Sequence, residues 1–291
     1  MDIVVHAVLA VLLIVTLYPV LHVASVSLSN GTAILKNVVT FYPIGLQFNA
    51  YALIFRTGKV PEAFRNAVLY TVVGTAVNLV MTIAMAYPLS KKRLTLRGLY
   101  TTLVVITMFF GGGLIPSFLV VRSLGLYNTL WALVIPGAIS TWNLIIMRTF
   151  FQALPVELEE SAHLDGAGDA TILVRIMLPL SRAAIATIGL FYLVGNWNSW
   201  FPAVIYLKDS WRYPLQVVLR EVVLQGQIAG ELVQKGLMRA AGQMDAGTDE
   251  YVSVEKIKYA TLFASMVPML LVYPFIQKYF VKGVMIGSLK G

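Results

Sequence analysis

The side chains best placed to do chemistry lie between Leu154 and Leu180. Three carboxylates, Glu157, Glu159 and Glu160, follow one another closely in this stretch. An active site would need a nucleophile, a carboxylate pair or a metal-ligand set that converges, and no such set is apparent here. The carboxylates are therefore predicted to contact another protein rather than to catalyse a reaction.

The same stretch carries the signals of a short helix. Pro155 suits a helix start, and acidic residues in the first turn face the positive end of the helix dipole. Gly166 and Gly168 would stop the helix, and Asp165 is expected to brace the turn. We predict an amphipathic helix parallel to the membrane surface, with carboxylates and a small apolar strip. The strip consists of Leu158, Ala162 and Leu164.

A second set of polar residues lies inside apolar sequence. Polar groups at membrane depth are costly, so they are candidates for a transport pathway. Aromatic rings can pack on sugar rings while amides bond to hydroxyls. The alternative is structural, because Asn and Ser join neighbouring helices and Trp marks the membrane interface. The substrate-path candidates are Asn143, Tyr192, Asn196, Trp197, Asn198, Ser199 and Trp200.

The composition explains which elements must position these residues. Of the 291 residues 58% are hydrophobic and only 12% are charged, with a mean hydropathy of +0.77. Soluble domains carry about a quarter charged residues, so the chain is predicted to lie mainly in lipid. There is no cysteine, and His6, His22 and His163 show no metal-ligand spacing. No metal site is expected, and the net charge of +8 is read as a topology signal rather than nucleic-acid binding.

Apolar runs of about 20 residues predict helices that cross the hydrocarbon layer. The chain, residues 1–291, is predicted to be one all-α transmembrane domain with about six such helices. The third should be broken or kinked by Gly111, Gly112, Gly113 and Pro116. The six predicted spans are residues 3–24, 67–89, 99–121, 129–147, 181–207 and 259–280.

Basic residues in the short loops predict the orientation. The connection between the second and third spans is rich in Lys and Arg, whereas the next connection offers only Arg122. The positive-inside rule places the first of these in the cytoplasm, and both termini then lie there too. The basic residues that decide the orientation are Lys91, Lys92, Arg93 and Arg97.

Two connections are too long to be simple turns and are predicted to lie outside. They are residues 25–65 and the polar insert 208–258. A long insert on a membrane scaffold more often carries recognition than packing. A flexible linker is the alternative, but several apolar and aromatic residues favour ordered structure. They are Trp211, Tyr213, Pro214, Leu215 and Val217.

One spacing resembles that of a known family. Glu160-Ser161-Ala162, then Gly166 after three residues, Ile176 after nine more, and Leu178-Pro179 are similar to the EAA signature of ABC-importer permeases. Ser161 stands where the signature usually has alanine. Other segments look like maltose-type carbohydrate permeases, and GGGLIP indicates the branch that imports oligosaccharides and polysaccharide fragments. These segments are MFFGGGLIPSFLVV, LGLYNTLWALVIPGAIS, NLIIMRTFFQALP, WNSWFPAVIYL and the tail GVMIGSLKG.

The resemblance implies a type I ABC importer permease in the bacterial inner membrane, surrounded by lipid. Residues 154–180 would form a cytoplasmic coupling loop whose helix seats in a cleft of an ATPase subunit. The implied partners are a second permease subunit, two cytoplasmic ATPase subunits that use ATP and Mg, an extracytoplasmic solute-binding protein and an oligosaccharide. No phosphate-binding G-x-x-x-x-G-K-[ST] motif occurs, so no cofactor is expected on this chain. The implied ATPase-docking residues are Glu159, Glu160, Ser161, Ala162, Asp165, Gly166, Ile176, Leu178 and Pro179.

Alternatives remain at this stage. An ion-coupled secondary transporter would need buried Asp, Glu or Lys at mid-membrane, and the six predicted spans contain none. An ABC permease for a non-sugar solute has the same signature, so only the wider resemblance favours sugars. The branch imports neutral and acidic oligosaccharides. The basic balance would suit an acidic one, such as alginate or pectin fragments, although most of that charge belongs to the topology signal.

Overall fold

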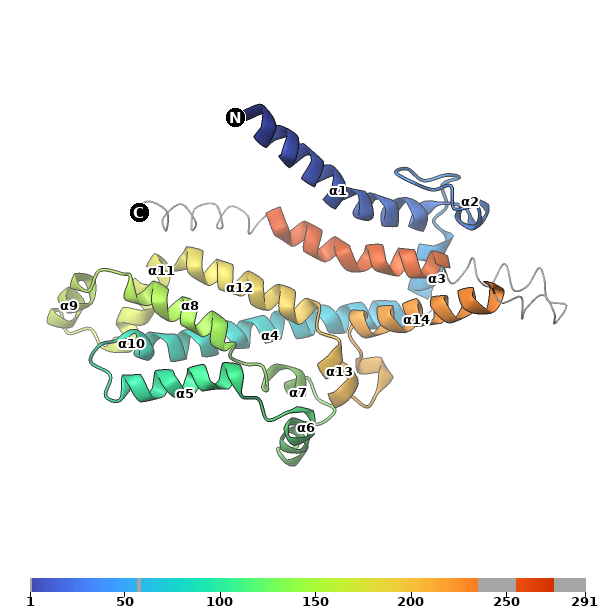
Figure 1. Cartoon of the computed structure of the whole chain (residues 1–291). Coiled ribbons are helices and arrows are strands. Elements are labelled where there is room, and N and C mark those ends of the chain that lie inside the picture. Colours follow the sequence, from blue (N-terminus) through green and yellow to red (C-terminus); the bar gives the residue numbers. More distant parts are fainter. Residues whose placement is uncertain (1, 57–58, 235–254, 275–291) are drawn as a thin grey trace. The chain divides into compact units, whose positions relative to one another are not determined.

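A computed structural model describes residues 2–56, 59–234 and 255–274, and these described parts are helical with loops between the helices (Figure 1). Apolar runs with few charges favour helices because the backbone satisfies its own hydrogen bonds within the segment. One further helix, Glu255–Pro274, follows the numbered ones. The numbered elements are α1 (Asp2–Leu28), α2 (Gly31–Leu35), α3 (Asn49–Arg56), α4 (Lys59–Ser90), α5 (Arg97–Phe109), α6 (Leu114–Ser123), α7 (Trp131–Val134), α8 (Thr141–Gln152), α9 (Glu157–Leu164), α10 (Asp169–Ile172), η1 (Leu173–Met177, π-helical), α11 (Leu178–Leu180), α12 (Arg182–Trp197), α13 (Phe201–Tyr206), η2 (Ser210–Arg212, 3₁₀) and α14 (Leu215–Gln234).

Three helices in the described part are long and apolar enough to cross a membrane: Ile3–Leu28 of α1, α4, and Glu255–Pro274. Two bent pairs also pass this test, which raises the number to five if each pair is one span. One pair is α5 with α6, bent by 117°, and the other is Asp169–Leu180 with α12, bent by 84°. The six spans drawn from the sequence stay a prediction.

The helix breaks differ in part from the predicted spans. The predicted break within span 99–121 is confirmed: α5 ends at Phe109 and α6 begins at Leu114, and Gly113 has a φ of +83°, a conformation that glycine adopts without strain. Span 129–147 is not one helix, since the loop between α7 and α8 contains Pro136 and Gly137. A proline has no N–H for the preceding turn, and the glycine adds flexibility, so the helix stops there. Predicted span 181–207 likewise divides into α12 and α13.

Several predicted features lie partly outside the described residues. Predicted span 259–280 continues beyond Pro274, and the insert 208–258 contains the undescribed stretch 235–254. The tail GVMIGSLKG also lies outside. Within the insert, α14 begins at Leu215, whose side chain is fully buried.

The chain divides into two compact units, so one domain over residues 1–291 stays a prediction. The first unit comprises residues 1–66 and 211–270. Its small core includes Val26 and Val39, and the Asn30 side chain caps α2 by accepting from the Ala33 N–H at 2.8 Å. Burial raises the pKa of Tyr51, whose hydroxyl lies 2.7 Å from that of Ser27.

The second unit comprises residues 67–210 and 271–291, and it holds the predicted functional residues. Figure 1 shows α4, α5, α8 and α12 side by side in this unit, with α9 beyond their ends. Its core is apolar, and Ala162 of α9 packs against it, so the helices support α9. The core residues with the least exposed side chains are Ala86, Leu144, Met147, Ile172, Met177 and Ile188.

Candidate coupling segment and polar helix seam

The short helix predicted in the coupling segment, residues 154–180, is α9. Three glutamates occupy its first turn, where they complement the helix dipole. The helix ends in a Schellman motif: the Gly166 N–H donates to His163 O at 3.0 Å, and the Ala167 N–H donates to Ala162 O at 2.9 Å. This motif needs a left-handed residue, and Gly166 has a φ of +79°. The glycine therefore sets the direction in which the chain leaves α9.

A largely buried ion pair holds the inner side of α9. The Lys91 ammonium, one residue beyond α4, contacts the Glu159 carboxylate, and their side chains are only 12% and 14% exposed. The same ammonium lies 4.1 Å from the centroid of the Tyr87 ring, where the face of the ring attracts a cation. Glu159 thus has a partner within its own chain.

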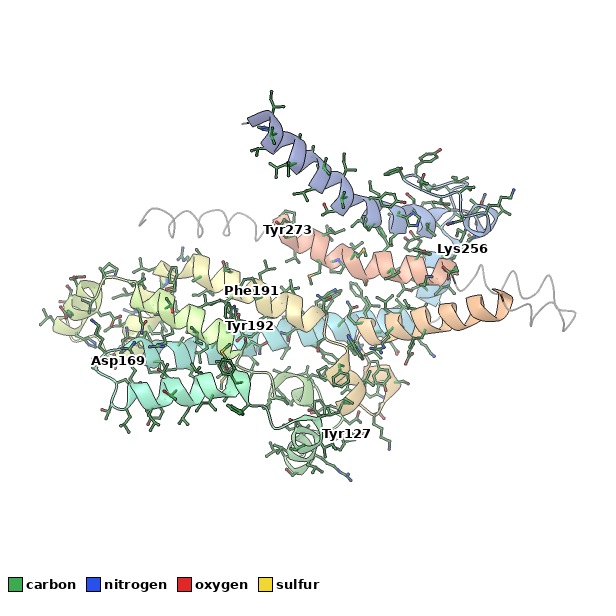
Figure 2. The ribbon with its side chains drawn as sticks, in the orientation of Figure 1. Tyr127, Asp169, Phe191, Tyr192, Lys256 and Tyr273 are labelled. Carbon is green, nitrogen blue, oxygen red and sulfur yellow. The ribbon has the colours of Figure 1, made fainter. Side chains whose placement is uncertain are left out.

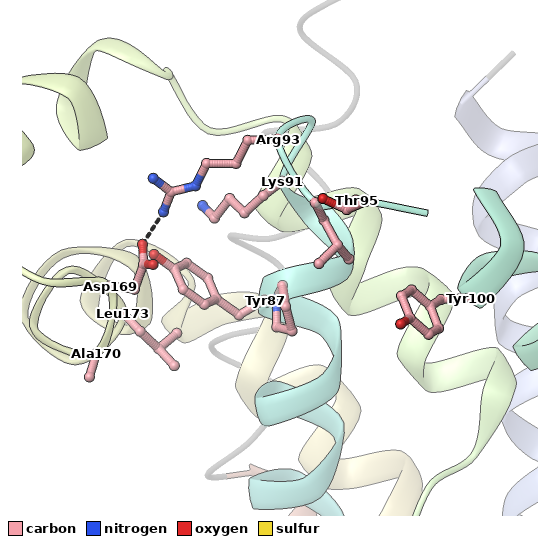
Figure 3. A pocket seen from close by; sticks show the side chains of 10 residues that line it. Tyr87, Lys91, Arg93, Thr95, Tyr100, Asp169, Ala170 and Leu173 are labelled. Atoms are coloured by element: carbon pink, nitrogen blue, oxygen red, sulfur yellow. Dashed lines mark hydrogen bonds and ion pairs between the residues drawn. The ribbon is translucent and has the colours of Figure 1, made fainter. Parts of the chain in front are cut away.

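A second, exposed ion pair joins the loop after α4 to the start of α10. Arg93 contacts Asp169 at the start of α10, and both side chains are more than half exposed. His163 Nε2 lies 3.7 Å from the same Asp169 carboxylate. Figure 3 shows Arg93 and Asp169 with the nearby Tyr87 and Lys91 side chains, all of which line a cavity of about 630 Å³.

The end of α4 is also held by guanidinium groups. The Leu89 carbonyl accepts from Arg97 Nε at 3.0 Å and from Arg148 Nε at 3.1 Å. Cations near a helix C-terminus satisfy its unpaired carbonyls and complement the dipole. Because Arg97 belongs to α5 and Arg148 to α8, one carbonyl joins three helices next to the coupling segment.

The predicted docking residues divide between two faces of the segment. Glu160, Ser161, Asp165, Gly166 and Pro179 are exposed. Glu159, Ala162, Ile176 and Leu178 are at least half-buried, and the last three pack against the core of this unit. Leu164, at the end of α9, is 90% exposed. The outer face therefore combines carboxylates with a protruding leucine.

The second site is a set of neutral hydrogen bonds, called here the polar seam, made by Asn78, Thr82, Tyr192 and Asn196 with residues 137–140. Tyr192 OH lies 2.6 Å from Thr82 Oγ1 and accepts from the Ser140 N–H at 2.9 Å. Asn196 Nδ2 donates to Asn78 Oδ1 at 2.9 Å. Asn78 Nδ2 in turn donates to the carbonyls of residues 137 and 138, at 2.8 and 3.0 Å.

The position of the seam explains its polarity. Residues 135–140 interrupt the helical structure between α7 and α8, and three of their backbone groups, the carbonyls of residues 137 and 138 and the Ser140 N–H, bond to seam side chains instead. At membrane depth such groups must be satisfied by protein, and Asn78 and Tyr192 do this. The helices also approach closely, because a Cβ on Gly74 would lie 2.9 Å from Asn196 Nδ2.

The remaining substrate-path candidates lie in different surroundings. Asn143 and Trp197 are buried, at 6% and 4% exposure. Ser199 and Trp200 are half-buried, and Asn198 is exposed at the end of α12. Tyr192 lies on α12, the helix that ends next to Asn198 (Figure 2). The structure therefore brings Tyr192 and Asn196 together with protein partners and leaves Asn198 accessible.

Sequence reasoning missed several of these partners. The sequence places Thr82 and Asp169 in no predicted site, and it indicates only a topology signal for Lys91. Asn128 was also missed: with a φ of +61°, its side chain accepts from the Lys208 N–H at 3.0 Å and donates to Asp209 at 2.7 Å. An Asn tolerates this left-handed conformation. No sequence spacing indicates such pairings, because their partners are far apart along the chain.

The fold and the site together define a class: a multi-helical membrane protein with a short, supported helix whose outer face is exposed and a seam of neutral groups between its helices. Comparison with known proteins is more specific. Residues 63–286 match the family described as "Binding-protein-dependent transport system inner membrane component". The chain belongs to this family and is an ABC-transporter permease of its carbohydrate-uptake branch.

Two relatives illustrate the match. The polygalacturonan/rhamnogalacturonan transport system permease protein YtcP of Bacillus subtilis is 41% identical over 290 residues, covering 100% of this chain and 98% of that protein. The arabinooligosaccharides transport system permease protein AraQ of Halalkalibacterium halodurans is 23% identical, covering 95% and 92%.

A solved structure agrees with the fold. It is described as a bacterial ABC transporter involved in the import of the acidic polysaccharide alginate. Its matching chain is 31% identical, with a TM-score of 0.83 and 96% coverage of both chains. These comparisons confirm the predicted family and the all-helical ABC-importer permease fold. The chain is the permease component in the inner membrane, not a catalytic subunit, and the family implies a binding protein and an ATPase as partners.

Proposed function

We propose that this chain forms half of the translocation path of an oligosaccharide importer, together with a second permease subunit. A solute-binding protein delivers the oligosaccharide from outside. Two cytoplasmic ATPase subunits, which bind the ATP and Mg, supply the energy. The observation that carries this proposal is the outer face of α9, which exposes carboxylates and a leucine. The inner face of the same helix is held by contacts within this chain.

The outer face of α9 has the chemistry of a docking surface. Leu164 is 90% exposed, and Glu160 and Asp165 are exposed on the same short helix and its end. A large exposed apolar side chain surrounded by polar groups favours a protein contact. Burial of Leu164 in a cleft of the ATPase, with Glu160 paired at its rim, would satisfy both kinds of group.

The ion pairs support a cytoplasmic position for this end of the chain. Lys91 and Arg93 belong to the connection that the positive-inside rule assigns to the cytoplasm. Both contact the coupling segment, so the basic connection and α9 lie on the same side of the membrane. A cytoplasmic α9 meets cytoplasmic ATPase subunits, and both termini follow it to that side if the chain crosses the membrane six times.

The substrate is proposed to be an acidic oligosaccharide. Polygalacturonan, which YtcP is named for, is a polymer of a uronic acid, and the similar solved structure is described for alginate import. Within the chain, Asn198, Ser199 and Trp200 are the proposed sugar contacts. Tyr192 and Asn196 already use their polar groups in the polar seam.

The test begins by tagging this chain in its own host, extracting it in mild detergent and identifying what copurifies. A second multi-helical permease and an ATPase should appear, and the reconstituted complex should hydrolyse ATP. Uronic-acid oligosaccharides with the binding protein should stimulate hydrolysis, and neutral ones should not. A chain that emerges alone and well folded contradicts the proposal, whereas stimulation by neutral sugars alone rejects only the acidic substrate.

A further inference from the structure

The two ion pairs that hold the coupling segment differ in their surroundings. Lys91 and Glu159 are about 12% and 14% exposed, whereas Arg93 and Asp169 are 56% and 58% exposed. A pair in water forms and breaks at little cost, but a buried charge that loses its partner is strongly unfavourable. The Lys91–Glu159 contact should therefore persist while α9 moves, and the Arg93–Asp169 contact need not.

The Lys91 ammonium also contacts the end of α4, so it cannot easily follow Glu159 without α4. It lies 4.1 Å from the centroid of the Tyr87 ring, and that ring is only 6% exposed. Tyr87 also packs edge-on against Phe151 of α8, with ring centroids 6.2 Å apart. The backbone N–H of Lys91 donates to Pro88 O at 3.1 Å, which continues the last turn of α4. Both the backbone and the side chain of Lys91 therefore contact the end of α4.

The same helix makes the polar seam. Asn78 and Thr82, one turn apart on α4, bond to Asn196 and Tyr192 on α12. From Asn78 to Ser90 the chain is continuous helix. A helix transmits a displacement along its length, so α4 connects the coupling segment at one end with α12 along its middle.

We propose that Lys91 and Glu159 are positioning residues for coupling: their buried ion pair makes α9 and α4 move together, and α4 passes the motion to α12 through the polar seam. The exposed Arg93–Asp169 pair steadies the loop without transmitting motion. This inference rests on the proposed docking of α9 to the ATPase. It assigns the transmission step to an interaction inside this chain.

The experiment uses the complete transporter in proteoliposomes, with its binding protein and uronic-acid oligosaccharides. ATP hydrolysis is measured with and without the loaded binding protein, and uptake is measured in parallel. The variants are Lys91→Met, Glu159→Gln and Lys91→Arg, which keeps a cation for both Glu159 and the Tyr87 ring. Arg93→Gln is the matched control, because it removes the neighbouring, exposed ion pair.

Lys91→Met and Glu159→Gln should both lower the ratio of stimulated to basal hydrolysis by about tenfold, and uptake should fall with it. Lys91→Arg should keep the ratio at no less than about half of the wild-type value, and Arg93→Gln should keep it within about twofold. A role limited to stability would lower the amount of assembled complex without changing this ratio.

A wild-type ratio in Lys91→Met or Glu159→Gln overturns the inference, as does an assembled Lys91→Arg that is as uncoupled as Lys91→Met. If Lys91→Met does not assemble, Lys91→Arg and Glu159→Gln, which keeps the side-chain volume, decide the question. The proposed function fails separately: then even the wild-type chain shows no stimulated hydrolysis, or Gly166→Val transports normally.

Discussion

The coupling segment and the polar seam both hold helices together, but through different kinds of interaction. Around α9 the ties are charged, through Lys91 with Glu159 and Arg93 with Asp169. The seam bonds between α4 and α12 join neutral side chains, amides or hydroxyls. A charge at membrane depth is costly, whereas one near the aqueous interface can reach water. The contrast indicates that the depth of a contact in the membrane decides whether charged or neutral side chains make it.

The two regions also differ in what they hold. The seam satisfies backbone groups at a break in helical structure, so its loss would leave polar atoms unpaired in an apolar place. The ties around α9 hold a helix whose proposed task is to move. Substitutions can therefore separate an effect on coupling from an effect on stability.

The largest effect is expected at Gly166. Valine there must adopt a φ of +79°, which costs an L-residue about 1–2 kcal/mol and a β-branched one more. The Schellman motif would be lost and α9 would turn differently, so uptake in cells should be abolished while the protein still inserts. Gly168→Ala is the control, since Gly168 has a φ of −77° and free space around it. Normal uptake by the valine variant would contradict the role of the turn.

The next effect is expected in the seam, at Gly74. A Cβ there lies 2.9 Å from Asn196 Nδ2, so Gly74→Ala must displace Asn196 from its hydrogen bonds. We expect a loss of about 1–3 kcal/mol in the free energy of unfolding, read as a lower thermal midpoint in detergent. Gly195→Ala, where a Cβ meets open space, should be neutral or slightly stabilising. Equal thermal midpoints for Gly74→Ala and Gly195→Ala would show that α4 and α12 do not pack closely at Gly74.

A smaller effect is expected from Tyr192→Phe, which leaves the Ser140 N–H and the Thr82 hydroxyl without this partner. Hydrogen bonds inside membrane proteins contribute about 1 kcal/mol or less, so the loss of stability should be of that size. A double-mutant cycle with Thr82→Val should show coupling between the two positions. Tyr42→Phe, at a side chain 67% exposed, serves as the control. Additive losses would argue against a direct bond.

The smallest effect is expected from Arg93→Gln. Its ion pair is exposed, and such pairs contribute about 0.5 kcal/mol or less and weaken with salt. The thermal midpoint should hardly change at low salt and not at all at high salt. A large drop would show that this pair is as important for stability as the buried one, which would break the contrast between the two ties.

Much of the coupling segment could be read from the sequence. Pro155, the acidic first turn and Gly166 are local signals, and the structure has a helix that begins and ends where they predict. The division of the docking residues could not be read in this way. Glu159 and Glu160 are neighbours of one type, yet Glu159 pairs with Lys91, 68 positions away, while Glu160 is exposed.

By itself, the sequence determined the membrane environment, the helical class and the position of α9, because these follow from composition, apolar run length and capping within a few residues. Only the tertiary structure decided which polar groups are bonded within the chain. Tyr192 and Asn196 could have contacted a sugar or another helix, and the sequence allowed both readings. Their partners lie more than fifty positions away, Ser140 at a helix break and Asn78 on α4, and such pairings arise only when the helices pack.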